Sequence, residues 1–195
     1  MSPRKWMYVL RGNGESHQAW SDRMRNEVSP RLLDLEPSKL QLTVTEAPPP
    51  KVASSVSGYE VEEAYPVAYD KAWSDGEPTP SPILLTMLRK KGGISSEEFI
   101  RRWHDGHTPL SLEIHPLWYY QRNVIREPVT QGADASDGIV LEACRTRGDF
   151  LNPARFFGGA LKMVPNMLRV AKDVSGFLDM RKTETFYATE YHLRS

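Results

Sequence analysis

An internal repeat is the sequence feature that most strongly limits the fold of this chain. A shift of 79 residues aligns 14–44 with 93–123 without a gap, and a shift of 80 then aligns 57–62 with 137–142. Many aligned positions hold glycine or proline, which determine turns and helix ends rather than fill space. These pairs are Gly14 with Gly93, Pro30 with Pro109, Pro37 with Pro116 and Gly58 with Gly138. The sequence therefore predicts two copies of one unit.

Both copies predict the same order of elements, which is a strand, a helix and two strands. Alternation of apolar and polar residues predicts the strands. Ser95 and Glu98 form a capping box that begins the second helix, and Gly106 with Thr108-Pro109 predicts its end. The predicted strands are 3–11, 38–46, 59–65, 83–90, 117–125 and 137–146, and the predicted helices are 16–26 and 95–106.

Such a β-α-β-β unit has a sheet covered by helices on one face, so the fold class is α+β. Two units can pack sheet against sheet and enclose a barrel-like interior within one chain. We therefore expect a first repeat at 1–73, a linker at 74–82 that contains three prolines, and a second repeat at 83–195. The expected assembly is a monomer with an internal pseudo-dimer, or a homodimer that uses its outer surfaces.

Composition argues against several classes of protein. The 25 Lys and Arg residues balance 25 Asp and Glu residues, so no excess of positive charge favours a nucleic-acid partner. No apolar run is long enough to span a membrane, and the N-terminal residues lack a signal peptide's apolar region. We expect a cytoplasmic protein without a membrane partner. The single cysteine, Cys144, cannot form an internal disulfide.

The second copy carries polar side chains where the first is apolar. Burying a hydroxyl or an amide without a partner costs about 1–3 kcal/mol, so this difference predicts a polar pocket between helix and sheet in the second copy. The alternative is a hydrogen-bonded core histidine, with the tyrosine and asparagine facing solvent. The aligned pairs are Leu40 with Tyr119, Leu42 with Gln121, Val44 with Asn123 and Val28 with His107.

His107 is the first candidate for chemistry, as a general acid or base. Tyr119 and Asn123 would hold or polarise a substrate oxygen, with Gln121 beside them. The alternative role of His107 is to cap the last carbonyl groups of its helix. Trp103 and Tyr120 would pack against the ring of a ligand, although rings at such positions are equally common in an ordinary core.

His104 and Cys144 are weaker candidates for the same pocket. His104 precedes His107 by three residues, and this spacing on a helix can hold a metal. No third or fourth ligand is evident, so no metal is expected, and His104 is assigned to the pocket edge or to solvent. Cys144 could line the cavity as a thiol, but a lone cysteine on a strand is usually a small apolar filler.

Residues 149–180 form an apolar segment without a counterpart in the first copy. Gly158-Gly159 and Pro165 interrupt it. One interpretation is a pair of short helices that complete the core. The other is a flap over the pocket, with the two glycines as its hinge.

The second half resembles the EthD-like family of dimeric α/β-barrel proteins. The resemblance covers 81–195 and depends on FIRRWHDGHTPL (99–110), PLWYYQRNV (116–124) and DGIVLE (137–142). The last segment, 170–192, resembles that family's final helix, F-x-D turn and closing strand. The first half matches only through the internal repeat.

The resemblance implies tandem ferredoxin-like repeats whose sheets form an α/β barrel, with pockets between sheet and helices. Family members include cofactor-free cyclases, dehydratases and lactone isomerases that act on aromatic or polyketide-like compounds. Others are accessory proteins of degradation pathways. The histidine of the H-x-P-L motif, here His107, is the residue that the family implies as catalytic. The fusion of two copies and the glycine-interrupted segment depart from the family pattern.

The expected function is therefore that of a lyase or isomerase, without a cofactor, acting on a small hydrophobic ligand. His107 would transfer a proton next to a carbonyl or hydroxyl group, leading to elimination, isomerisation or ring closure. Oxidation of a substrate carbanion by oxygen remains a variant of this chemistry. A non-catalytic binder of a pathway intermediate is the alternative from another class, and haem binding through His107 is a further one.

Overall fold

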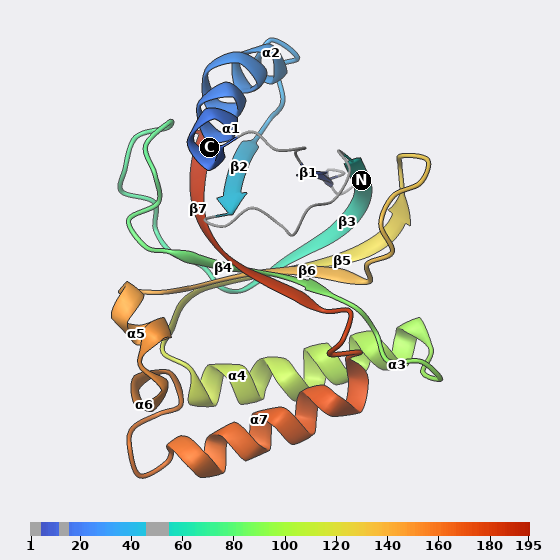
Figure 1. The fold of residues 1–195 in the computed structure, drawn as a ribbon, viewed down its shortest axis with the longest axis vertical. Coiled ribbons are helices and arrows are strands. Elements are labelled where there is room, and N and C mark those ends of the chain that lie inside the picture. The colour runs from blue at the N-terminus through green and yellow to red at the C-terminus, as the bar shows by residue number, and fades with distance from the viewer. Residues whose placement is uncertain (1–4, 12–15, 46–54) are drawn as a thin grey trace.

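The computed structural model describes residues 5–11, 16–45 and 55–195 (Figure 1). The start of the first predicted strand, Gly14 of the repeat and most of the proline-rich connector lie outside these ranges.

A single curled sheet of seven antiparallel strands organises the chain into a mixed α+β fold. The strand order is β1-β3-β5-β6-β4-β7-β2, so β1 and β2 form the two edges (Figure 1). The sheet curls into half a barrel. The strands are β1 (Lys5–Arg11), β2 (Leu40–Thr45), β3 (Ser55–Val67), β4 (Ile83–Leu88), β5 (Leu117–Pro128), β6 (Gly138–Cys144) and β7 (Glu184–Arg194).

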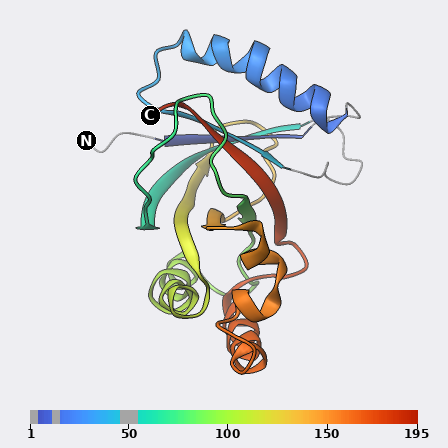
Figure 2. The ribbon, with the colours of Figure 1, turned by 90° about the vertical axis from the view of Figure 1, so that its left-hand side faces the viewer.

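Helical segments cover the outer face of this curled sheet at two places. The helix of the first half crosses above it, whereas the two long helices of the second half lie below it and are seen nearly end-on in Figure 2. The first half contributes α1 (His17–Arg23), η1 (Met24–Val28) and α2 (Ser29–Leu33). The second half contributes α3 (Ser96–Arg101), η2 (Arg102–His107), α4 (Thr108–Ile114), α5 (Arg147–Leu151), α6 (Pro153–Phe156) and α7 (Met163–Phe177).

The two halves share local detail as well as the order β-α-β-β. Ser16 and Ser95 cap their helices by accepting hydrogen bonds from the third following backbone N–H. Each helix then contains a π-helical turn, η1 or η2, at the aligned position. In each, a hydroxyl donates to the carbonyl oxygen five residues earlier. These bonds are Ser29 Oγ to Met24 O at 2.7 Å and Thr108 Oγ1 to Trp103 O at 3.0 Å.

Both helices extend beyond their predicted ends, because each continues through its π-helical turn. His107 was expected at the end of its helix, but the helix continues to Ile114. The wide turn starts a new helical segment at Thr108, where Pro109 occupies the first turn and needs no backbone donor. The first helix likewise continues past the predicted residue 26 to Leu33.

The strands of the two halves are placed differently. The third strand, β3, pairs with β1 and β5, while β2 pairs with β7 at the far edge. One continuous sheet therefore replaces the two face-to-face sheets that were expected. The predicted linker also packs into the structure, because Thr79 and Ser81 are buried and Thr79 N donates to Glu190 O at 2.8 Å.

Two hydrophobic cores lie on opposite faces of the curled sheet. The inner core fills the concave face and includes Tyr59, Ile83, Tyr119 and Leu141. The outer core lies between the sheet and the helices of the second half. It contains Leu88, Phe99, Trp103, Tyr120, Val124, Val140, Phe177 and Leu178.

Residues of β2 and β5 that are aligned in the repeat face opposite sides of the sheet. Tyr119, Gln121 and Asn123 face the inner core, beside Ala143, Leu141 and Ile139 of β6. In β2, Gln41 and Thr43 lie opposite His192 and Glu190, so Leu42 and Val44 face the other side. The register shifts at Leu40/Gln41 in β2 and at Leu117/Tyr119 in β5. An offset of one residue turns every side chain to the opposite face.

The segment 149–180 completes the helical layer. Helix α7 packs on η2 and α4, where Arg102 Nη1 donates to Gly176 O at 2.9 Å and Phe177 enters the outer core. The short helices α5 and α6 precede it, and Gly158 and Gly159 adopt positive φ between α6 and α7. The segment therefore differs from the expected pair of short helices, because the 15-residue helix α7 follows α5 and α6.

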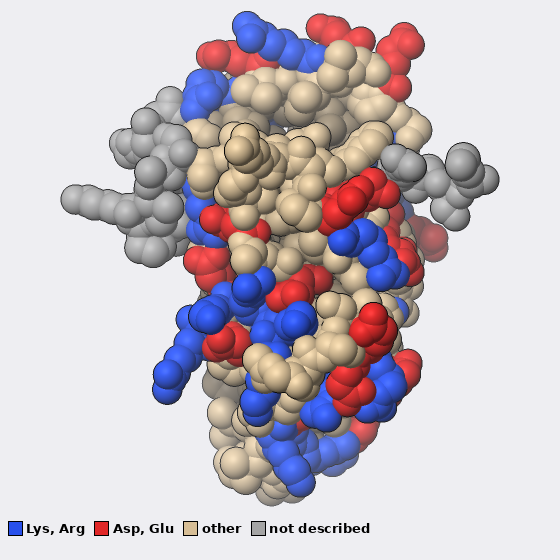
Figure 3. Space-filling model, turned by 90° about the vertical axis from the view of Figure 1, so that its right-hand side faces the viewer, with Lys and Arg blue, Asp and Glu red and all other residues tan. Residues whose placement is uncertain are grey.

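Charge on the surface is mixed. The face in Figure 3 has Lys and Arg beside Asp and Glu, without a large area of one sign. Among the described residues, no helix has the length and apolarity needed to cross a membrane.

Candidate functional site

The sheet separates the predicted site residues into two groups, which corrects the expectation of one shared cavity. Residues on the helix and those on alternate positions of β5 face opposite sides of the same sheet, because strand side chains alternate. The group on the helical side is Trp103, His104, His107 and Tyr120, and the group on the concave side is Tyr119, Gln121 and Asn123.

His107 is held between two polar side chains on the helical side. Its Nδ1 lies 2.7 Å from Asp173 Oδ2 of α7, and its Nε2 lies 3.1 Å from Ser111 Oγ. A carboxylate only accepts hydrogen bonds, so Nδ1 carries the hydrogen and Nε2 is left as the basic nitrogen. The side chain is 16% exposed, and its ring centroid lies 5.5 Å from that of Phe177. The geometry is that of an oriented general base.

Trp103 and Tyr120 belong to the core. Trp103 Nε1 donates to Tyr120 OH at 3.2 Å, and both side chains are fully buried. Burial raises the pKa of Tyr120 to about 12, so its hydroxyl stays protonated. A Cβ at Gly138 would lie 2.6 Å from the Trp103 ring, so only glycine lets β6 approach this closely. These contacts agree with the alternative that both rings are ordinary core residues.

Glu142 is a candidate acid that the sequence interpretation missed. It lies opposite Tyr120 in the pairing of β5 with β6, and it shares the helical face of the sheet. Burial raises the pKa of the Glu142 carboxyl to about 7, and the charge of His107 acts in the opposite direction. It aligns with Glu62 in the internal repeat, which favours a structural role and drew attention away from chemistry. The sequence feature that could have identified Glu142 is a single acidic residue within the otherwise apolar strand GIVLEAC.

Stability should depend on pH through Glu142. Between pH 4.5 and about 7 the unfolded chain ionises this carboxyl while the folded chain keeps it protonated, so the free energy of unfolding falls as pH rises. Glu142→Gln should remove this decrease. Urea denaturation at several pH values between 5 and 8 measures it, with Glu127→Gln, an exposed glutamate, as the control. Equal pH dependence in wild type and Glu142→Gln would contradict the assignment.

The two hydrogen-bond partners of His107, Ser111 and Asp173, could not be predicted equally well from the sequence. Ser111 lies four residues after His107, so helical spacing could have identified it. Asp173 lies 66 residues away, and only the packing of α7 brings it to His107.

His104 is half-buried on η2. Its ring centroid lies 5.3 Å from that of Trp103, and its buried Nε2 has no hydrogen-bond partner among the described residues. Burial, together with the charge of Arg122, lowers the pKa of His104, which favours the neutral ring. Within the described ranges, no three His, Cys, Asp or Glu side chains form a group able to hold a metal.

Cys144 is fully buried on β6. Burial raises the pKa of its thiol to about 12, so the nucleophilic thiolate is disfavoured. The contacts of Cys144 agree with an apolar filler rather than a catalytic thiol.

On the concave face, the three polar residues of β5 are hydrogen-bonded. Tyr119 OH donates to Gln121 Oε1 at 2.8 Å, and Gln121 Nε2 donates to Glu63. Asn123 Nδ2 donates to Ile139 O at 3.1 Å, while its buried Oδ1 has no partner among the described residues. Burial, together with the negative charge of Glu190, raises the pKa of Tyr119, so this hydroxyl acts as a donor.

A buried acid and histidine of β7 form a second hydrogen-bonded group on the concave face, and the sequence interpretation missed both. Glu190 is 1% exposed, and its Oε2 lies 3.1 Å from His192 Nε2 and 3.0 Å from Tyr69 OH. Tyr69 OH also lies 2.6 Å from His192 Nε2. Glu190 Oε1 has no partner within the described part of the chain. Glu190 and His192 could have been identified from their spacing of two residues on a strand, which directs both side chains to one face.

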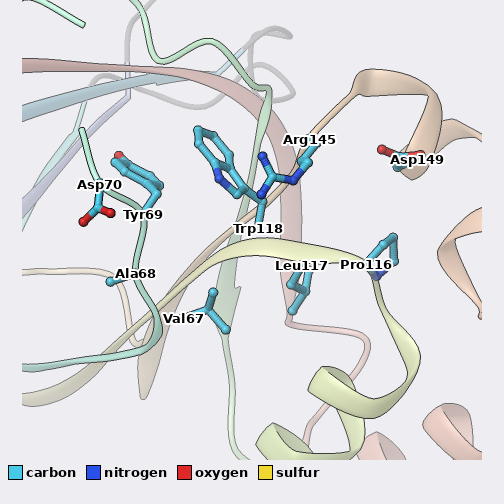
Figure 4. A pocket seen from close by; sticks show the side chains of 9 residues that line it. All are labelled: Val67, Ala68, Tyr69, Asp70, Pro116, Leu117, Trp118, Arg145 and Asp149. Carbon is cyan, nitrogen blue, oxygen red and sulfur yellow. The ribbon is translucent and has the colours of Figure 1, made fainter. Parts of the chain in front are cut away.

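A surface cavity of about 580 Å³ lies where β3 ends and β5 begins (Figure 4). Tyr69, Trp118 and Arg145 are among its lining residues. None of the residues predicted for the site lines it.

No family model matches the chain, and no curated protein matches it. Its function is therefore inferred from the arrangement of its own side chains.

Proposed function

We propose that this protein is a cofactor-independent enzyme that transfers a proton within a small hydrophobic compound. The observation that carries the proposal is the position of His107, whose imidazole is oriented by Asp173 on one nitrogen and by Ser111 on the other. A carboxylate that orients a histidine is the usual arrangement for a general base.

In the proposed step, His107 Nε2 removes a proton from a carbon next to a carbonyl group. Glu142 is the acid that protonates the carbonyl oxygen, and the raised pKa of its carboxyl, about 7, suits that role near neutral pH. The enol so formed would lead to isomerisation, elimination or ring closure. Tyr119 and Asn123 face the concave side of the sheet, so this proposal assigns them no part in the step.

The proposed substrate is aromatic or polyketide-like. The ring of Phe177, 5.5 Å from that of His107, supports this, and Phe177 belongs with Phe99 and Trp103 to the outer core. The EthD-like resemblance implies a pocket between helices and sheet, and His107 lies on the helical side of the sheet.

We also propose that the chain consists of two divergent ferredoxin-like repeats, the second of them EthD-like. The order β5-β6-β4-β7, the shared helix caps and the shared π-turns support this proposal. The turn Phe177–Asp179 between α7 and β7 is the F-x-D feature of the resemblance. The placement of β2 beside β7 is an exchange of strands between the repeats.

A non-catalytic binding protein is the second candidate. The position of the cavity favours it, because the cavity is lined by none of His107, Ser111, Asp173 or Glu142.

The two candidates differ in their response to Asp173→Asn. For an enzyme, this change should lower kcat by about 10–100-fold with little change in KM, because a histidine that loses its orienting carboxylate is misplaced. A panel of phenolic and polyketide-like compounds, followed by mass spectrometry, first identifies the substrate.

Glu113→Gln is the matched control. Glu113 joins α4 to α7 through Arg169, with nitrogen–oxygen distances of 2.8 and 2.9 Å, and does not contact His107. It should leave kcat unchanged. If both variants lose stability equally and neither loses turnover, the bond between His107 and Asp173 only joins two helices, and the catalytic proposal is wrong.

A further inference from the structure

We propose that the cavity at the start of β5 binds a small aromatic carboxylate, with Arg145 as the partner of the carboxylate group. This site is separate from His107, and the proposal does not depend on the proposed enzymatic function. Its volume of about 580 Å³ is within the range of pockets for small molecules, about 300–1,000 Å³.

Apolar side chains form one wall of the cavity. Val67 lies at the end of β3, and Pro116, Leu117 and Trp118 lie at the start of β5. Figure 4 shows the ring of Tyr69 beside that of Trp118. Their centroids are 4.8 Å apart and their planes differ by 23°. This wall suits the flat apolar surface of an aromatic ring.

The Tyr69 ring is fixed in position by buried groups behind it. Its hydroxyl contacts Glu190 Oε2 at 3.0 Å and His192 Nε2 at 2.6 Å, and its ring packs against Trp73 at 5.0 Å. A wall held in this way needs little rearrangement to accept a ligand, so the entropic cost of binding is reduced.

Arg145 supplies a positive charge beside the Trp118 ring (Figure 4). Its guanidinium lies 5.8 Å from the centroid of the Trp118 ring and is exposed. Within the described residues, no carboxylate forms an ion pair with Arg145. A guanidinium offers the paired N–H groups that match a carboxylate, so this is the group that a ligand's anion would meet.

The two acidic residues of the lining do not neutralise Arg145. Asp149 accepts hydrogen bonds from Thr146 N at 3.1 Å and Thr146 Oγ1 at 2.8 Å, in the capping box of α5. Asp70 lies on the far side of Tyr69 from Arg145 in Figure 4. The charged group that lies against the Trp118 ring is the Arg145 guanidinium, so an anion is favoured at that position.

Isothermal titration calorimetry of the full chain with three matched probes tests the proposal. The probes are 2-naphthoate, the neutral 2-naphthamide and the cationic 2-naphthylmethylammonium. We expect saturable one-to-one binding of 2-naphthoate. The amide should bind about 10–100-fold more weakly, because it lacks the charge-assisted hydrogen bonds. The cation should bind no better than the amide.

Arg145→Leu should weaken 2-naphthoate binding about 10–100-fold and leave the affinity for the amide nearly unchanged. Arg181→Leu, at an exposed arginine outside the lining, is the control and should bind like wild type. If Arg145→Leu fails to fold, Arg145→Gln replaces it, and the comparison of probes on wild type still stands. The proposal is overturned if 2-naphthoate shows no saturable binding, if the amide or the cation binds as tightly, or if Arg145→Leu binds 2-naphthoate like wild type.

Discussion

Replacing His107 with Ala should lower kcat for the proposed proton transfer by about 10²–10⁴-fold, the usual contribution of a general acid or base. Affinity for the substrate should fall far less, since a group that acts in the transition state contributes little to ground-state binding. Steady-state kinetics with the substrate identified by the panel measures both effects.

His107→Gln is the informative companion variant. Its amide can still donate a hydrogen bond to Asp173 but cannot take up a proton, so kcat should stay as low as in His107→Ala. Recovery of activity in His107→Gln would indicate that hydrogen bonding, rather than proton transfer, is the role of this residue. A folded His107→Ala protein with full activity would exclude His107 from the mechanism. His192, paired with Glu190 on the concave face, would then be the next acid–base candidate.

Trp103→Ala should destabilise the fold by about 3–5 kcal/mol, the range for removing a large buried aromatic side chain. Trp103 is 0% exposed and packs against Phe99 with ring centroids 5.5 Å apart. The substitution would also remove the hydrogen bond to Tyr120 OH and leave a void above Gly138. The free energy of unfolding, from urea denaturation followed by circular dichroism, measures the loss.

Trp6→Ala is the control for this prediction. Trp6 lies on the edge strand β1 and is 53% exposed, so its replacement should change the free energy of unfolding by less than about 1 kcal/mol. Similar losses in the two variants would contradict the placement of Trp103 at the centre of the outer core.

Local structure was predictable wherever a short stretch of sequence determines it. Ser16 and Ser95 begin their helices as N-caps, because a serine side chain satisfies a backbone donor that the helix itself leaves free. The order β-α-β-β in both halves follows the periodicity of apolar residues. Pro109 was misread as a stop signal, because a π-turn was not considered.

The site was predictable only in part. His107 could be found from its motif and from its position on the helix, and Ser111 follows from helical spacing. The grouping with Tyr119 and Asn123 was wrong, because an alignment without gaps cannot show the one-residue offset between β2 and β5. That offset places the polar face of β5 on the concave side of the sheet.

By itself, then, the sequence determined the helix caps, the repeated order of elements and the candidate histidine, because each depends on residues that are close along the chain. Tertiary structure decided the rest. The pairing of β2 with β7 and the approach of Asp173 to His107 join residues far apart in sequence. Such contacts depend on which surfaces the whole chain buries together, and no local pattern records that choice.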